Sequence, residues 1–259
     1  MDILTTIIIG YVSVLGLFMG SFLNLVADRL IANKTILGRS QCDHCRKILS
    51  PLALIPVVSY VLGAARSLCC KKHLSWTYPA SELTTAVAYG SGWYFAPVST
   101  TLEHIIVLVL ISILLLILFA DMKAQIIPDE AQIAMLIVGS TLFFVQGETV
   151  QMFLQHGVAG VAVMIPILLI YALTRGRGMG FGDVKFAFVM GYILGMKGGF
   201  FALYLSFIIG AVIASGLMLM GRAKMKQKIA FGPFLVIGFS IIFFAGNELL
   251  PIATRLMGF

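Results

Sequence analysis

The sequence predicts an all-α, polytopic membrane protein with about eight transmembrane helices. Hydrophobic residues make up 60% of the 259 residues, charged residues only 11%, and the mean hydropathy is +1.02. A soluble domain carries about 25% charged residues, so this chain has too few to cover a surface that faces water. Apolar runs recur along the chain at close to the ~20 residues that cross a bilayer as a helix. Within lipid, a helix bonds all of its own backbone polar groups.

The predicted spans are separated by charged residues, Pro and Gly. They cover residues 4–27, 80–97, 103–120, 131–146, 156–174, 184–196, 198–221 and 231–250. The first run lacks a basic n-region and a small-x-small cleavage site, so we interpret it as a retained span. The sixth is short and is flanked by Gly.

Three parts of the chain follow from this pattern. Residues 1–27 form the first transmembrane helix, residues 28–79 form a polar loop between the first two spans, and residues 80–259 form a transmembrane bundle. All four cysteines lie in the loop. His104 and His156 stand alone at outer helix starts, and we interpret them as interfacial residues.

The distribution of Lys and Arg predicts the orientation, because cytoplasmic loops are enriched in these residues. With the N-terminus outside, all but two of the 18 Lys and Arg residues face the cytoplasm, the exceptions being Lys197 and Arg255. The loop 28–79 is then cytoplasmic. The net charge of +7 implies no nucleic-acid partner, since contact with anionic inner-leaflet lipid accounts for it.

Two acidic residues lie at the inner ends of predicted spans. Asp121 ends the third span, and Asp183 precedes the sixth. Carboxylates at the edge of lipid are costly and are therefore functional candidates. Two that meet share a proton, so the ionised one can activate a water while the other protonates a carbonyl oxygen. A single interfacial acid is explained by contact with water, but two on the same membrane face favour peptide hydrolysis.

Glycines alternate with other residues just before Asp183. Gly178, Gly180 and Gly182 leave the backbone without side chains, so an extended peptide could approach closely there. We therefore predict Gly180 and Gly182 as substrate-binding residues. The structural alternative is a glycine-rich helix end.

Five segments together resemble the type IV prepilin leader peptidases. GMGFGDVK is similar to the GxGD motif of intramembrane aspartic proteases, and ADMKAQIIPDE resembles the family's other acidic segment. GSFLNLVADRL (20–30), IPVVSY (55–60) and YPASE (78–82) resemble three further family stretches, in the family's order.

The resemblance implies an enzyme of the bacterial inner membrane that removes the basic leader of prepilins or pseudopilins at the cytoplasmic face. It further implies methylation of the new N-terminus with S-adenosylmethionine; the hydrolysis needs no cofactor. The family's catalytic pair falls on Asp121 and Asp183. Asp129 is the alternative for the first of these and is interpreted as a charge at a helix start. Glu82 matches a family acid, here assigned to substrate or cofactor positioning; its alternative is an ordinary acid at a helix start.

The cysteines predict a metal site in the loop. Disulfides are disfavoured in the cytoplasm, whereas four thiolates suit a structural zinc ion. The family has two CxxC pairs, and this chain departs from that pattern because Ser67 stands where the third cysteine is expected. The predicted ligands are Cys42, Cys45, Cys70 and the extra Cys69. His44 or His73 could complete the site instead, and a set of reduced thiols without metal is the alternative. Ala53, Leu54 and Thr77 depart from the family too, and these losses weaken the methyltransferase assignment.

Two other functional classes remain open from the sequence. An ion- or proton-coupled transporter would also place acids in a helical bundle, but near mid-membrane and with inverted repeats. A non-catalytic assembly component of a pilus or secretion system would keep the fold without turnover. The absence of a repeat and the acids at span ends favour the peptidase. The pattern indicates no particular oligomeric state.

Overall fold

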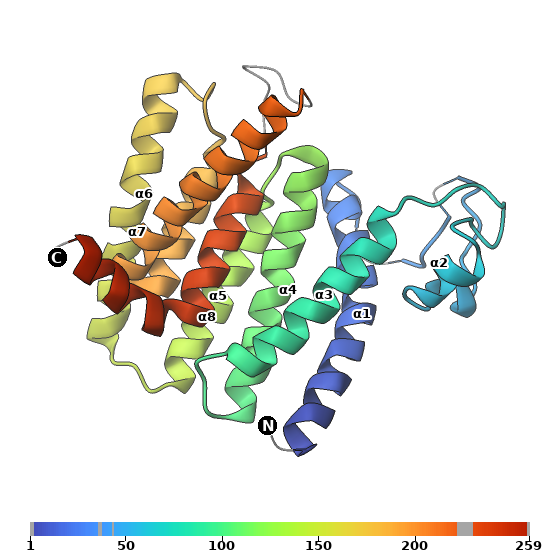
Figure 1. Cartoon of the computed structure of the whole chain (residues 1–259), viewed down its shortest axis with the longest axis horizontal. Helices are drawn as coiled ribbons and strands as arrows, with labels where there is room; N and C mark the ends of the chain where they lie inside the picture. The colour runs from blue at the N-terminus through green and yellow to red at the C-terminus, as the bar shows by residue number, and fades with distance from the viewer. Residues whose placement is uncertain (1–2, 36–37, 43, 222–229, 258–259) are drawn as a thin grey trace. The chain divides into compact units, whose positions relative to one another are not determined.

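The computed structural model describes residues 3–35, 38–42, 44–221 and 230–257, and these are helical apart from connecting loops (Figure 1). Within those ranges the β-structure amounts to two isolated bridges. The helices are α1 (Ile3–Ile31), η1 (Pro51–Leu54), α2 (Val58–Leu62), α3 (Thr77–Phe95), α4 (Thr101–Ala124), α5 (Asp129–Val145), α6 (Val150–Thr174), α7 (Phe181–Leu219) and α8 (Gly232–Met257).

Among the described residues, five helices are long and apolar enough to cross a membrane: α1, α4, α6, α7, and α8 up to Pro251. The prediction of an all-α, multi-pass membrane protein is thereby confirmed. Helices α3 and α5 occupy the second and fourth predicted spans. The Lys-rich segment 222–228, part of the argument for orientation, lies outside the described residues, and the orientation stays a prediction.

The chain forms two compact units, residues 1–94 and 95–259. The first contains α1, η1, α2 and nearly all of α3, and the second contains α4 to α8. The division expected after residue 79, between the polar loop and the transmembrane bundle, is not tested by these units and stays a prediction. Each unit is described by itself below.

In the first unit, α1 and α3 touch through glycine. A Cβ added to Gly16 would lie 2.8 Å from the Cα of Ala86, and one added to Gly20 would lie 2.7 Å from the Cα of Glu82. Small residues let helix backbones approach this closely, which is how many membrane helices pack.

In the second unit, the long helix α7 contains a reversal of the chain. Gly195 has φ 71° and ψ 178°, which is not helical. A Cβ added to Gly199 would lie only 2.8 Å from the Cα of Gly191, whereas residues eight apart in a straight helix are about 12 Å apart. Therefore α7 consists of two antiparallel segments that meet through glycines. These segments carry the predicted sixth and seventh spans, 184–196 and 198–221.

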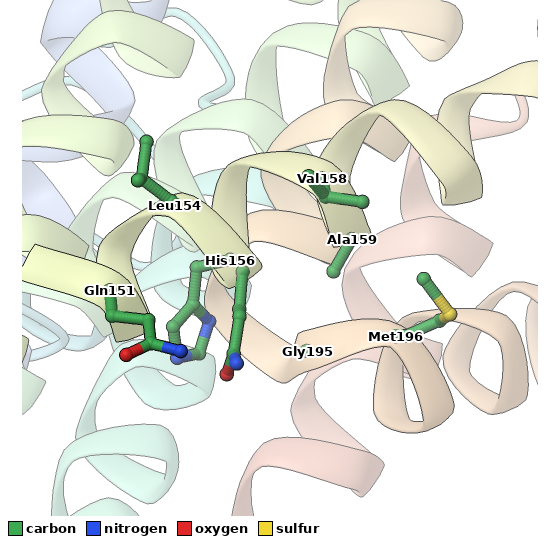
Figure 2. A pocket seen from close by; sticks show the side chains of 8 residues that line it. Gln151, Leu154, His156, Val158, Ala159, Gly195 and Met196 are labelled. Atoms are coloured by element: carbon green, nitrogen blue, oxygen red, sulfur yellow. The ribbon is translucent and has the colours of Figure 1, made fainter.

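His156 fastens α6 to the end of the first α7 segment. Its Nδ1–H donates to the carbonyl of Tyr192 over 2.7 Å, and its Nε2 lies 3.3 Å from the carboxylate of Glu148. A cavity of about 540 Å³ opens beside it, with Gly195 and Met196 on the facing segment (Figure 2). His156 is thus tied into the bundle, which its interpretation as a simple interfacial residue did not anticipate.

The interior of the second unit is apolar and tightly filled. Its fully buried side chains come from every helix of the unit and include Ile117, Met135, Val163, Phe186 and Phe239. This core fixes the ends of α4 and α7, which carry Asp121 and Asp183, and the start of α8, which carries Gly232.

Candidate active site

Asp121 lies in the last turn of α4. The helix ends at Gln125, which adopts a left-handed conformation (φ 55°) and donates its N–H to the carbonyl of Asp121 over 2.8 Å. The Asp121 side chain points into the unit and is only 4% exposed. A buried acid therefore closes this helix, at the position predicted from the sequence.

Asp183 lies in the first turn of α7. Its Oδ2 accepts the N–H of Gly180, the residue that caps the helix, over 3.0 Å. An acid at this position is favoured twice, by the unpaired N–H groups of the first turn and by the helix dipole. These contacts fix the rotamer of the carboxylate.

The structure brings Asp121 and Asp183 together. Their carboxylates are near enough for the two charges to interact. Asp121 Oδ2 accepts the N–H of Gly232, the first residue of α8, over 2.9 Å. Each acid is thus oriented by a glycine N–H at the start of a helix. Two carboxylates in this arrangement can share one proton and act as general base and general acid.

Gly232 is a site residue that the sequence did not reveal. A Cβ at this position would lie 2.6 Å from Oδ2 and 2.8 Å from Cγ of Asp121, so a larger residue would displace the carboxylate. The Gly232-Pro233 pair at the start of the last predicted span was the available signal. It reads equally well as an ordinary helix start.

The two glycines that were predicted from the sequence, Gly180 and Gly182, are used in packing around Asp183. A Cβ at Gly182 would lie 3.2 Å from the Cβ of Ile127, in the connection between α4 and α5. A Cβ at Gly180 would lie 3.3 Å from Oδ2 of Asp183. Both glycines therefore let the start of α7 sit close to its neighbours. Their predicted role in binding substrate stays a prediction.

Asp129 is engaged elsewhere. It begins α5, and its two carboxylate oxygens accept from Lys185 Nζ over 2.8 and 2.7 Å. The pair is partly exposed. This arrangement agrees with the interpretation of Asp129 as a charge at a helix start, although its exclusion from catalysis stays a prediction.

Glu82 lies in the first unit and is buried. Its Oε2 accepts the N–H of Val57 over 2.7 Å, and the hydroxyl of Ser21 bonds the same carboxylate. Val57 has φ 58° and ψ −47°, an unfavourable conformation for a β-branched residue. The Glu82 carboxylate thus stabilises a strained turn between η1 and α2. Segments 20–30, 55–60 and 78–82, noted in the sequence, meet at this residue.

The four cysteines form one cluster, also in the first unit. Their Sγ atoms all lie within 4.8 Å of one another. Cys42 and Cys70 are 3.8 Å apart at sulfur, and Cys45 and Cys69 are 3.3 Å apart. A tetrahedral zinc ion with Zn–S bonds of 2.3 Å separates its sulfurs by about 3.8 Å. The donor set fits zinc.

Two matching turns build this cluster. In the first, Cys42 N–H donates to Lys47 O and Arg46 N–H donates to Cys42 O; in the second, Ser67 N–H donates to Lys72 O and Lys71 N–H donates to Ser67 O. Arg46 and Lys71 both have positive φ.

The match aligns Ser67 with Cys42, and Cys70 with Cys45. Ser67 therefore occupies the place of a cysteine, as the resemblance to the family implied. Cys69 supplies the fourth sulfur of the cluster in place of Ser67, and its Sγ lies 3.0 Å from the Ser67 hydroxyl oxygen.

The thiols of the cluster differ in acidity. Burial raises the pKa of Cys42, but hydrogen bonds from the backbone of Cys45 and His44 and from the Ser67 side chain outweigh it and lower the pKa to about 6. The backbone N–H of Lys47 lowers the pKa of Cys45, but the neighbouring Cys69 and Cys42 raise it to about 11. Ionisation of one thiol thus disfavours ionisation of its neighbour, as expected for like charges, and a bound cation would relieve that repulsion.

Comparisons with known proteins match both units. The model described as the bacterial peptidase A24 N-terminal domain matches residues 14–95, and that of the type IV leader peptidase family matches residues 108–215. A protein of Bacillus subtilis named prepilin leader peptidase/N-methyltransferase is 29% identical, over 92% of this chain and 94% of its own. The protein of that name from Aeromonas hydrophila is 30% identical, over 82% of this chain and 73% of its own. No solved structure matches.

Proposed function

This chain belongs to the type IV leader peptidase family, and from that premise we propose that Asp121 and Asp183 are its catalytic pair. The protein is then a membrane-embedded aspartic endopeptidase that removes the leader of prepilins or pseudopilins. The observation that supports this proposal is that two buried acids lie near enough for their charges to interact and that each accepts a glycine N–H.

The reaction needs only these side chains and a water. The ionised carboxylate takes a proton from the water as its oxygen attacks the scissile carbonyl carbon, and the protonated carboxyl gives its proton to the carbonyl oxygen. When the tetrahedral intermediate collapses, the C–N bond breaks and the carboxyl that took the water proton gives it to the leaving amine, while the other carboxylate takes a proton from a hydroxyl of the intermediate. The N–H groups of Gly180 and Gly232 keep both carboxylates oriented throughout.

The position of the pair favours a peptidase over a transporter. Asp121 and Asp183 lie at helix ends, whereas coupling acids of transporters lie near the middle of the membrane. From the Lys and Arg distribution we place this end of the unit at the cytoplasmic face of the inner membrane, with the N-terminus outside. The proposed partners are prepilin-like substrates and membrane lipid, and we assign no nucleic acid.

Methylation is a second proposed activity, because the relatives are also named N-methyltransferases. The methyl donor would be S-adenosylmethionine, bound by the first unit. Glu82 is the candidate acid there, but its carboxylate already bonds Val57 and Ser21. The geometry of Glu82 fits a role in holding the turn better than direct contact with the cofactor, so no step of methyl transfer is assigned to it.

A structural zinc ion is the second proposed ligand of the first unit. Cys42, Cys45, Cys69 and Cys70 would hold it, and zinc stabilises loops too small to have a core of their own. Elemental analysis of the purified protein should give about one zinc per chain.

The proposed activity is tested by incubating the detergent-purified protein with a prepilin-like peptide that carries a basic leader. A peptidase releases the leader at a single bond, which mass spectrometry of the products identifies. A transporter or a non-catalytic assembly component leaves the peptide intact.

A further inference from the structure

A groove of the second unit, separate from the cavity beside His156, lies between α5, α6 and α7. It encloses about 310 Å³. Asp129, Gln132 and Leu136 line one side, at a spacing that puts them on one face of α5, and Lys185 and Phe188 of α7 face them. The groove is charged at its mouth and apolar further in.

Gln132 is the unusual residue of this groove. Its side chain is 3% exposed, and its Nε2–H donates to the carbonyl of Ile127 over 3.5 Å. Its Oε1 is buried and has no hydrogen-bond partner among the residues that the structure describes. A buried amide oxygen without a partner is rare in folded proteins and points to a ligand. That ligand must donate, because an amide oxygen only accepts.

The groove adjoins the proposed catalytic pair. Ile127, which accepts from Gln132, also packs against Gly182, the residue before Asp183. At the mouth, Lys185 is paired with Asp129 over both carboxylate oxygens, so the two charges cancel. A charged ligand would gain little from this mouth.

The chemistry of the groove selects its occupant. A lipid acyl chain fits apolar walls but brings no N–H for Gln132. An extended, apolar peptide segment supplies both, since it carries a backbone N–H at every residue that is not proline. We propose that this groove binds an apolar segment of the substrate next to the cleaved bond, and that Gln132 Oε1 accepts one of its backbone N–H groups. This inference rests on the proposed peptidase function.

The test replaces single amide bonds of a prepilin-like peptide by esters, one residue at a time on either side of the cut. Each ester removes one backbone N–H while keeping the side chains. With the wild-type protein, one ester position should lower kcat/KM about tenfold, the usual scale of one such hydrogen bond. Gln132→Leu should show the same loss with the all-amide peptide and no further loss with that ester. Gln155→Leu, which alters the cavity at the other end of α6, should keep the wild-type profile.

A photocrosslinking measurement covers the case in which Gln132→Leu fails to accumulate. An apolar peptide carrying a photoreactive leucine is bound to the Asp183→Asn protein, and crosslinked residues are mapped by mass spectrometry. Crosslinks to Leu136 or Phe188 support the groove as the substrate site.

Two results would overturn the inference. If Gln132→Leu keeps the wild-type ester profile, Oε1 is satisfied by water or lipid and not by substrate, while the peptidase assignment stands. Crosslinks that avoid α5 and α7 lead to the same conclusion. If the wild-type protein cleaves no peptide, the proposed function fails and the inference fails with it.

Discussion

Asp121 and Asp183 depend on glycines at two helix starts. Gly180 reaches Asp183 from three residues away, whereas Gly232 reaches Asp121 across 111 residues of sequence. Both donate a backbone N–H, which any residue except proline can do. Glycine is needed at position 232 because the backbone comes so close to Asp121 that a side chain would meet the carboxylate.

Gly232→Ala should therefore lower kcat for leader removal by about 100-fold, the scale expected when a catalytic group moves by about 1 Å. The added Cβ would stand 2.6 Å from Asp121 Oδ2. Cleavage of a prepilin-like peptide measures the effect. Gly216→Ala is the matched control, because a Cβ there meets nothing within 4 Å. Wild-type turnover in Gly232→Ala would mean that α8 does not orient Asp121.

A second single-residue change, Glu82→Gln, tests the proposed role of the first unit in methylation. Glutamine keeps an oxygen that accepts from Val57 N–H but loses the charge, so the hydrogen bonds that hold the turn between η1 and α2 weaken. We expect leader removal to continue and methylation to fall, and the mass of the processed product distinguishes a methylated from an unmethylated N-terminus. An unmethylated product from the wild-type protein supplied with S-adenosylmethionine would leave the chain a peptidase only.

Among the elements, α7 shows most clearly how glycine shapes this protein. Its two segments meet where Gly191 faces Gly199, and Gly191 also lies against α6. A Cβ on Gly191 would stand 2.6 Å from the carbonyl oxygen of Ala159. Gly191, inside the predicted sixth span, and Gly199, just after it, are thus packing residues of a tight helical hairpin.

Gly191→Leu should destabilise the protein by about 1–3 kcal/mol or more, since overpacking forces neighbouring elements apart. Thermal unfolding in detergent gives the measurement. Gly157→Leu, on the same bundle but with open space around its Cβ, should unfold close to the wild type. Equal stability of the two variants would argue against the antiparallel packing of α7.

The cysteine turns support a prediction about which sulfur completes the zinc site. Cys69→Ser should weaken zinc binding in competition with a chelator. The double variant Ser67→Cys, Cys69→Ser should restore it, because the two turns have the same hydrogen bonds and Ser67 matches Cys42. Cleavage should persist in all three proteins, since neither proposed catalytic acid belongs to this unit. Undiminished affinity in Cys69→Ser would remove Cys69 from the ligand set.

At the scale of the whole molecule, the sequence predicted those features that are set by residues close together in the chain. Apolar runs located the helices, and the Gly residues on either side of 184–196 indicated that α7 is divided into two segments. Asp121 and Asp183 stood out because acids are scarce in such a chain. Local pattern carries this information because helix length and lipid burial are set within a single segment.

Contacts between segments distant in the sequence could not be predicted from local patterns. Nothing near Gly232 indicates Asp121, and nothing near Val57 indicates that Glu82 accepts its N–H. The sulfur of Cys69 reaches the cluster only because two turns of equal geometry face each other. Such contacts arise from tertiary packing. A single sequence shows them only indirectly, for example as a glycine where a side chain would collide.

The central claim, that Asp121 and Asp183 act as one catalytic unit, is tested most directly by the cleavage rates of Asp121→Asn, Asp183→Asn and the double variant. Asparagine keeps the shape but cannot share the proton. Each single variant should lose roughly a thousandfold or more in kcat, and the double variant should be no worse, because groups that act together are not additive. Asp129→Asn should stay within about tenfold of the wild type, the scale of a partly exposed ion pair. If Asp121→Asn kept most of its activity while Asp129→Asn was inactive, the assignment of the pair would be wrong.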